Sequence, residues 1–137
     1  MSKSVVFLCT ENSNRSQMAE GFARHHSGGA FVAHSAGSSP KGEVNPKAIE
    51  AMAEKGIDLK EHRSKSTDEL PHRRFDAVIT MGCGDECPWL EGALREDWGL
   101  EDPRDLGPEG YRSVRDEIER RVIDLARRLQ RAEAERG

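Results

Sequence analysis

A run of five apolar residues, Val5 to Cys9, stands almost at the start of the chain and contains no alternating polar residue. This pattern is typical of a strand that is buried on both faces of a parallel sheet, because a strand with one face in water alternates apolar and polar side chains. Residues 31–36 and 77–81 predict two further strands, and residues 94–100 predict a short fourth strand around Trp98.

Helical segments separate and follow these strands. Residues 15–26 carry apolar side chains at helical spacing, Asn45 and Pro46 are typical of a helix start, and an apolar stripe from Val114 to Leu129 predicts a long terminal helix. This alternation predicts an α/β fold, a three-layer arrangement in which a four-stranded parallel sheet has helices on both faces. A length of 137 residues fits one domain over residues 1–137.

Composition excludes several classes of function. The chain has 21 Lys and Arg residues against 25 Asp and Glu residues, a net charge of −4, so it offers no positive field for nucleic acid. No stretch approaches the ~20 apolar residues of a membrane span, and Val5 to Cys9 is too short for a signal peptide. We therefore expect a cytoplasmic protein in which the three cysteines are reactive thiols rather than a disulfide framework.

The segment from Cys9 to Ser16 joins the first strand to the first helix. A loop of this length can turn successive backbone N–H groups inward and form a nest for a tetrahedral oxyanion. Arg15 would offer paired donors to two oxygens, the helix dipole would favour the thiolate of Cys9 as nucleophile, and Ser16 could hydrogen-bond that thiolate. The predicted substrate-binding residues are Thr10, Glu11, Asn12, Ser13, Asn14 and Arg15.

Two loop side chains have more particular expectations. Asn12 is suited to tie the backbone of the loop together, and we expect the Glu11 carboxylate to face solvent, since pointing inward would weaken anion binding. The alternative for the whole segment is that Cys9 is a small buried residue and Arg15 a charge on the helix surface. The apolar strand before the loop and the amphipathic helix after it favour the anion site.

These residues resemble a known family, the thiol-dependent arsenate reductases built on the low-molecular-weight tyrosine phosphatase scaffold. The similarity extends over essentially the whole chain. Cys9 to Ser16 is similar to the phosphate loop of the family, and further matching segments are residues 15–20, 35–37, 45–52, 56–58 and 101–103. The resemblance implies arsenate as substrate, phosphate and sulfate as its analogues, and no tightly bound cofactor.

The resemblance also implies a general acid at Asp102, directly before Pro103. An acid is needed because the departing oxygen leaves far more easily as water than as hydroxide. From the residues alone, an Asp-Pro pair is more often a simple turn, and Asp105 is a possible substitute.

Cys83 and Cys87 follow the third predicted strand, so they leave the same carboxyl edge of the sheet as Cys9. The hypothesis is a relay in which Cys83 attacks the sulfur of the Cys9 adduct and Cys87 then opens the Cys9–Cys83 disulfide. Thioredoxin or a low-molecular-weight thiol would then regenerate the enzyme. The alternatives are a zinc site, for which the spacing is only marginal and other ligands are scattered, and two inert buried residues.

The potassium site of some family members would use Asn12, Glu20, Ser35 and a carboxylate after Ser64, where this chain has Lys65. An ammonium group could replace the charge of the ion, so we expect potassium independence and no metal site. Two rival functions remain open. The same loop and acid would suit a phosphatase that forms a phosphocysteine, and a redox-regulated module could bind an oxyanion without turnover.

Overall fold

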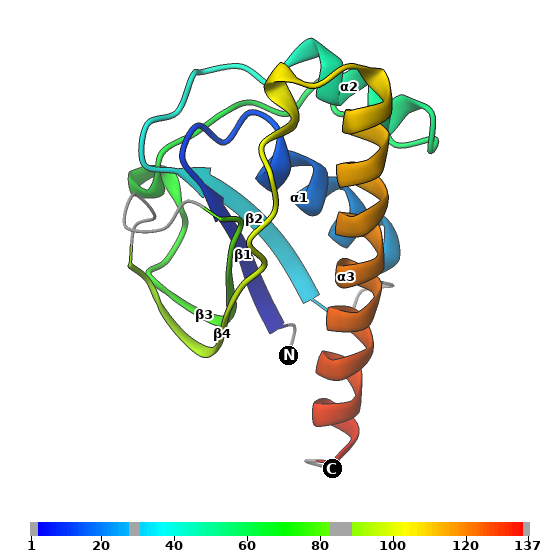
Figure 1. Cartoon of the computed structure of the whole chain (residues 1–137). Coiled ribbons are helices and arrows are strands. Elements are labelled where there is room, and N and C mark those ends of the chain that lie inside the picture. The colour runs from blue at the N-terminus through cyan, green and yellow to red at the C-terminus, as the bar shows by residue number, and fades with distance from the viewer. Residues whose placement is uncertain (1–2, 28–30, 83–88, 136–137) are drawn as a thin grey trace.

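The computed structural model describes residues 3–27, 31–82 and 89–135. The elements in chain order are β1 (Lys3–Cys9), α1 (Arg15–His26), β2 (Phe31–Gly37), α2 (Pro46–Ala53), η1 (Thr67–Glu69), β3 (Arg74–Thr80), β4 (Glu91–Asp97), η3 (Pro103–Asp105) and α3 (Pro108–Glu135), the two η elements being short 3-10 helices. The fold is therefore the predicted α/β type, in which helices follow β1, β2 and β4 (Figure 1).

The four described strands form one sheet in the order β2-β1-β3-β4, and every neighbouring pair is parallel. The central strand β1 pairs with both β2 and β3, and its last residue, Cys9, lies beside Gly37 at the end of β2. Because all strands run the same way, their carboxyl ends meet at one edge of the sheet, which is where open α/β folds place their binding sites.

The two faces of the sheet are covered unequally. Val5, Phe7 and Cys9 point into the larger apolar cluster, which includes residues from α1, α2 and α3. Val6 and Leu8 point into a smaller cluster on the opposite face, against which Leu70 packs just after η1. In the described part of the chain, the three α-helices therefore share the first face (Figure 1), and the second face carries Leu70 just after the 3-10 turn η1, which itself buries no residue.

Local sequence signals explain the element ends. The Asn45 side chain accepts a hydrogen bond from the backbone of Lys47 (2.9 Å), which caps α2 as predicted.

The fourth strand is shifted from the predicted residues 94–100 to Glu91–Asp97. β4 is an edge strand whose residues are exposed or half-buried, so it lacks the apolar run that marks the other strands. Trp98 follows it and packs on Phe7, with ring centroids 5.7 Å apart.

None of the helices in the described residues combines the length and the apolar character that a membrane crossing requires.

Candidate anion-binding active site

Cys9 ends β1 with its side chain buried, and two hydrogen-bond donors face its sulfur. The backbone N–H of Asn12 lies 3.2 Å from the sulfur, and the hydroxyl of Ser16, in the first turn of α1, lies 2.8 Å from it. The amide of Asn12 donates to the same hydroxyl oxygen (2.7 Å), which leaves the hydroxyl hydrogen of Ser16 free to point at sulfur. Both contacts stabilise negative charge on the sulfur, which is what a thiolate nucleophile requires.

Asn12 holds the loop in shape from behind. Its backbone is in the left-handed region (φ 52°), and its side chain is fully buried. The side-chain oxygen accepts hydrogen bonds from the amide of Gln17 and from the backbone N–H of Lys65, each 3.0 Å long. Asn12 therefore ties the loop together as predicted, and in addition it fastens the loop to residues 63–65.

Ser64, in the same segment of residues 63–65, makes a second contact with the anion loop. Its hydroxyl donates to the backbone carbonyl of Glu11 (2.6 Å) and accepts from the backbone of Lys41 (2.9 Å). Gly37 allows the loop to lie close to β2, because a Cβ at this position would stand 2.5 Å from the carbonyl oxygen of Thr10. The base of the loop is thus fixed on two sides.

Arg15 is buried and anchored before any substrate binds. Its Nη1 donates to the backbone carbonyls of Met81 (2.6 Å) and Leu100 (2.7 Å), which leaves Nη2 and Nε for an anion. Gly82, at φ 90°, permits this arrangement, since a Cβ there would lie 3.0 Å from the Leu100 oxygen and 3.3 Å from Arg15 Nη1. Arg15 is therefore an internal residue of the site, unlike the surface charge of the alternative interpretation.

Asp102 lies beside the loop, although 87 residues separate it from Arg15 in the chain. One oxygen of its carboxylate lies 3.8 Å from Arg15 Nη2. The other oxygen accepts a hydrogen bond of 3.4 Å from the side-chain amide of Asn14. Tyr111 donates its hydroxyl to the other end of that amide (3.1 Å) and so fixes which end faces Asp102. Burial, followed by the charge of Asp102, raises the pKa of Tyr111, which keeps the phenol protonated as the donor. Asp102 also caps the N-terminus of η3. The same side chain therefore stabilises the Asp-Pro turn and lies beside the anion loop.

A cavity of about 70 Å³ opens between these groups. It is lined by Cys9, Thr10, Glu11, Ser13, Asn14, Arg15, Asp102 and Arg104. Five of the six predicted substrate-binding residues line it. Asn12, the sixth, lies behind the loop, where it acts on the sulfur and the backbone.

The prediction that Glu11 faces solvent holds only in part, because its side chain is half-buried, with 22% exposed. Its carboxylate oxygens each lie 3.1 Å from Nη1 of Arg104, and one of them lies 3.8 Å from the ammonium of Lys41. The two cations offset the repulsion that an unpaired carboxylate would exert on a bound anion. They allow Glu11 to line the cavity.

Cys83 and Cys87 lie outside the described residues, so their relay and the zinc and inert alternatives stay predictions. Within the described ranges, no group of three or more His, Cys, Asp or Glu side chains could hold a metal ion.

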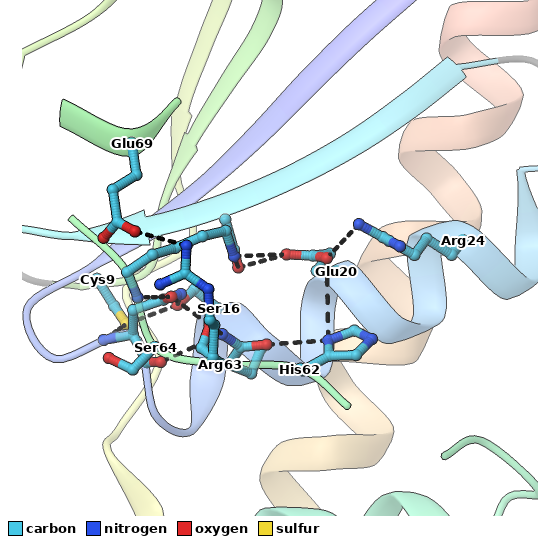
Figure 2. Close-up of polar contacts among 12 residues, drawn as sticks. Cys9, Ser16, Glu20, Arg24, His62, Arg63, Ser64 and Glu69 are labelled. Atoms are coloured by element: carbon cyan, nitrogen blue, oxygen red, sulfur yellow. Dashed lines mark hydrogen bonds and ion pairs between the residues drawn. The ribbon is translucent and has the colours of Figure 1, made fainter. Parts of the chain in front are cut away.

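Behind the loop lies a buried charged cluster centred on Glu20, whose carboxylate accepts a 2.5 Å hydrogen bond from Ser35 (Figure 2). The ammonium of Lys65 lies 3.4 Å from Glu20 and 3.3 Å from the Ser35 hydroxyl. Arg24 contacts the second oxygen of Glu20 at 2.7 Å. The ammonium group of Lys65 thus contacts the side-chain oxygens of both Glu20 and Ser35.

His62 connects this cluster to the loop. Its Nδ1 lies 3.0 Å from the amide oxygen of Gln17 and 3.8 Å from Glu20. Burial lowers the pKa of His62, so at neutral pH the ring is neutral and its Nδ1 hydrogen bonds to Gln17. This bond turns the Gln17 amide nitrogen toward Asn12, so the cluster helps to hold the loop.

Sequence reasoning missed three residues of this site: Arg104, Tyr111 and Gln17. Gln17 follows Ser16 directly, but its burial is visible only in the structure, because a glutamine on a first helical turn is ordinarily exposed. Arg104 and Tyr111 are separated from the loop by about ninety residues, and only the packing of α3 on α1, with η3 against α3, brings them there.

Comparison with known proteins gives relatives with the same architecture. Residues 4–135 match the low molecular weight phosphotyrosine protein phosphatase family. The arsenate reductase of Staphylococcus xylosus is 44% identical over 119 residues, 85% of this chain and 90% of that protein. The glutaredoxin arsenate reductase of Synechocystis is 38% identical and covers 93% of this chain and 98% of its own.

Solved structures agree with the fold. An arsenate reductase in its phosphate-binding state superposes with a TM-score of 0.85 at 38% identity and covers 93% of this chain and 98% of its own. A thioredoxin-dependent arsenate reductase of Corynebacterium glutamicum gives a TM-score of 0.79 at 33% identity, covering 96% of this chain and 63% of that one. The chain therefore belongs to the low molecular weight phosphotyrosine protein phosphatase family, and the relatives described above are arsenate reductases within it.

Proposed function

We propose that this protein is an arsenate reductase that uses Cys9 as its nucleophile. The observation that carries the proposal is the cavity of about 70 Å³ that Cys9, Arg15 and Asp102 line together. A site of this size suits an inorganic tetrahedral oxyanion, since organic ligands occupy pockets of roughly 300–1,000 Å³. Arsenate reductase relatives at 38–44% identity support the choice of substrate.

The first step forms a sulfur–arsenic bond. The Cys9 thiolate attacks the arsenic of HAsO₄²⁻, Asp102 protonates the hydroxyl group that departs as water, and Arg15 binds the remaining oxygens. A second thiolate then attacks the Cys9 sulfur. The electron pair of the sulfur–arsenic bond stays on arsenic, so As(V) becomes As(III), arsenite leaves, and the two sulfurs are oxidised to a disulfide.

The second thiol is Cys83 in our hypothesis, followed by Cys87, and an external thiol reduces the final Cys83–Cys87 disulfide. The reductant belongs to the thioredoxin or low-molecular-weight thiol systems; among the relatives, one is named a glutaredoxin arsenate reductase and another a thioredoxin-dependent arsenate reductase. We infer that the reaction takes place in the cytoplasm, because the cycle starts from a reduced thiol and disulfides persist mainly in oxidising compartments.

One experiment separates the two routes of resolution. Fully reduced protein is mixed with arsenate for a single turnover, and peptide mapping then locates the oxidised cysteines. We expect a Cys83–Cys87 disulfide and one equivalent of arsenite without any added thiol. If Cys9 stays reduced and arsenite forms only when a small thiol is present, the internal relay is wrong.

The same cavity supports a second, weaker activity on phosphate monoesters. Phosphate has the geometry of arsenate, and attack by Cys9 with protonation by Asp102 would release an alcohol and leave a phosphocysteine. Cys83 and Cys87 have no part in that hydrolysis. We therefore propose phosphatase activity as a side reaction. Arsenate reduction is the main reaction in this proposal, because only reduction uses the two resolving thiols.

We also propose that the enzyme needs no potassium ion. The ammonium of Lys65 lies within 3.4 Å of Glu20 and Ser35, two of the residues from which the family would build its potassium site, so a cation there would meet a fixed positive charge. We expect kcat/KM to stay unchanged when sodium is replaced by potassium at constant ionic strength. In Lys65→Met we expect potassium to raise the melting temperature above the value in sodium. A potassium-stimulated wild type would contradict the proposal.

A further inference from the structure

The outer edge of the anion cavity is closed by an ion pair between two loops that are far apart in the sequence. Glu11 belongs to the anion loop and Arg104 to η3, and Nη1 of Arg104 lies 3.1 Å from both carboxylate oxygens. The side chain of Arg104 is 44% exposed and those of Asp102 and Glu11 are 25% and 22% exposed, whereas Cys9 at the base of the cavity is 3% exposed. Arg104 is therefore the outermost residue of the lining, and Asp102 and Glu11, which both contact it, lie beside it at the rim.

Arg104 is itself held from the acid side of the cavity. Its Nε lies 3.3 Å from a carboxylate oxygen of Asp102, and its backbone N–H donates to the other oxygen at 3.0 Å. The charges of Asp102 and then Glu11 raise the pKa of Arg104 and keep it cationic at any working pH. One guanidinium thus connects the acid on η3 with the loop that carries Cys9.

The small volume of the cavity makes the position of the Arg104–Glu11 ion pair important for larger substrates. The cavity of about 70 Å³ is far below the roughly 300–1,000 Å³ of pockets for organic ligands, so the organic group of a phosphate ester would have to leave through the outer edge. That edge is where Arg104 and Glu11 meet. An unesterified oxyanion has no such group and requires no opening.

We propose that the Arg104–Glu11 pair is a specificity determinant, selecting unesterified tetrahedral oxyanions over phosphate esters with bulky substituents. This inference rests on the proposed function, because it explains how a phosphatase-type loop favours an inorganic substrate. The pair is partly exposed, so it stays weak enough to open, and the selection is a preference rather than an absolute block. Specificity of this kind comes from excluding the competitor.

The test measures binding alone, so it does not depend on arsenate reduction. Inorganic phosphate and phenylphosphonate, which differ by one aryl substituent, are titrated calorimetrically into the whole reduced protein. We expect the wild type to bind phosphate about tenfold more tightly than phenylphosphonate, and Glu11→Ala to reduce that ratio to about threefold or less. Lys41→Met removes the other cation beside Glu11 without opening the pair, and it should keep the wild-type ratio.

Two results would overturn the inference. Equal affinity of the wild type for both ligands, or a ratio in Glu11→Ala that stays at the wild-type value because both affinities change in parallel or not at all, would each remove the size selection. Glu11→Gln keeps the length of the side chain and removes its charge. It therefore distinguishes the effect of closing the cavity from the effect of the charge, and it replaces Glu11→Ala in the test if that variant does not fold. A wild type that selects by size but does not reduce arsenate would instead refute the proposed function alone.

Discussion

Replacing Cys9 by serine is expected to abolish both arsenate reduction and phosphate ester hydrolysis, by roughly 10³-fold or more in kcat. The serine hydroxyl would receive the same two contacts, from Asn12 and Ser16, but a hydroxyl is a far weaker nucleophile than a thiolate. It cannot form the sulfur–arsenic bond or the later disulfide. The two rates are measured as arsenite release with excess reductant and as p-nitrophenyl phosphate hydrolysis.

The matched control is Cys83→Ser. It should lose arsenate reduction and keep ester hydrolysis, because hydrolysis of a phosphocysteine uses water rather than a second thiol. Phosphate affinity of Cys9→Ser, measured by calorimetry, should stay near the wild-type value, since Arg15 and the loop backbone are unchanged. Equal loss of both activities in Cys83→Ser would contradict the separate roles of the two thiols.

The second large effect is expected for Asp102→Asn, which should lower the rate of adduct formation by about 10²–10⁴-fold. Asparagine keeps the shape of the side chain and caps a helical turn as well as aspartate does, so η3 should be preserved. What it lacks is the proton for the departing oxygen. Stopped-flow measurement of the first turnover isolates this step from the reductant.

Asp105→Asn is the control for this prediction, because Asp105 closes the same short helix as the other candidate acid. Its adduct formation should stay near the wild-type rate. A loss in Asp105→Asn with full activity in Asp102→Asn would reassign the acid. A wild type that forms no adduct with arsenate, together with unchanged phosphate binding in Asp102→Asn, would favour an anion-binding module over an enzyme.

The sequence predicted those parts of the site that are local. The strand of residues 5–9, the loop after it and the helix at Arg15 form a continuous segment, so hydrophobic pattern and spacing were sufficient to predict them. The terminal helix followed from its stripe, and Asn45 followed from its capping chemistry. Asp102 was predicted only through a family resemblance, because an Asp-Pro turn has the same local appearance.

What could not be predicted depends on contacts across the fold. Glu11 alone indicates a solvent-facing carboxylate, and only the approach of Arg104 from η3 turns it into a lining residue. The fourth strand gave a weak signal because an edge strand needs few apolar residues, which is why its start was placed three residues late. The gathering of α1, α2 and α3 on one face likewise follows from packing rather than from any single periodicity.

The bond between Asn12 and the backbone of Lys65 has a consequence for how this loop can be reused. The left-handed turn at Asn12 is maintained by groups from residues 63–65 and by Gln17, none of which lines the cavity. A graft of residues 9–16 onto another strand and helix would carry the nucleophile and the arginine but would lose this support. The site is therefore not a portable motif, and transplanting it requires the distant segment as well.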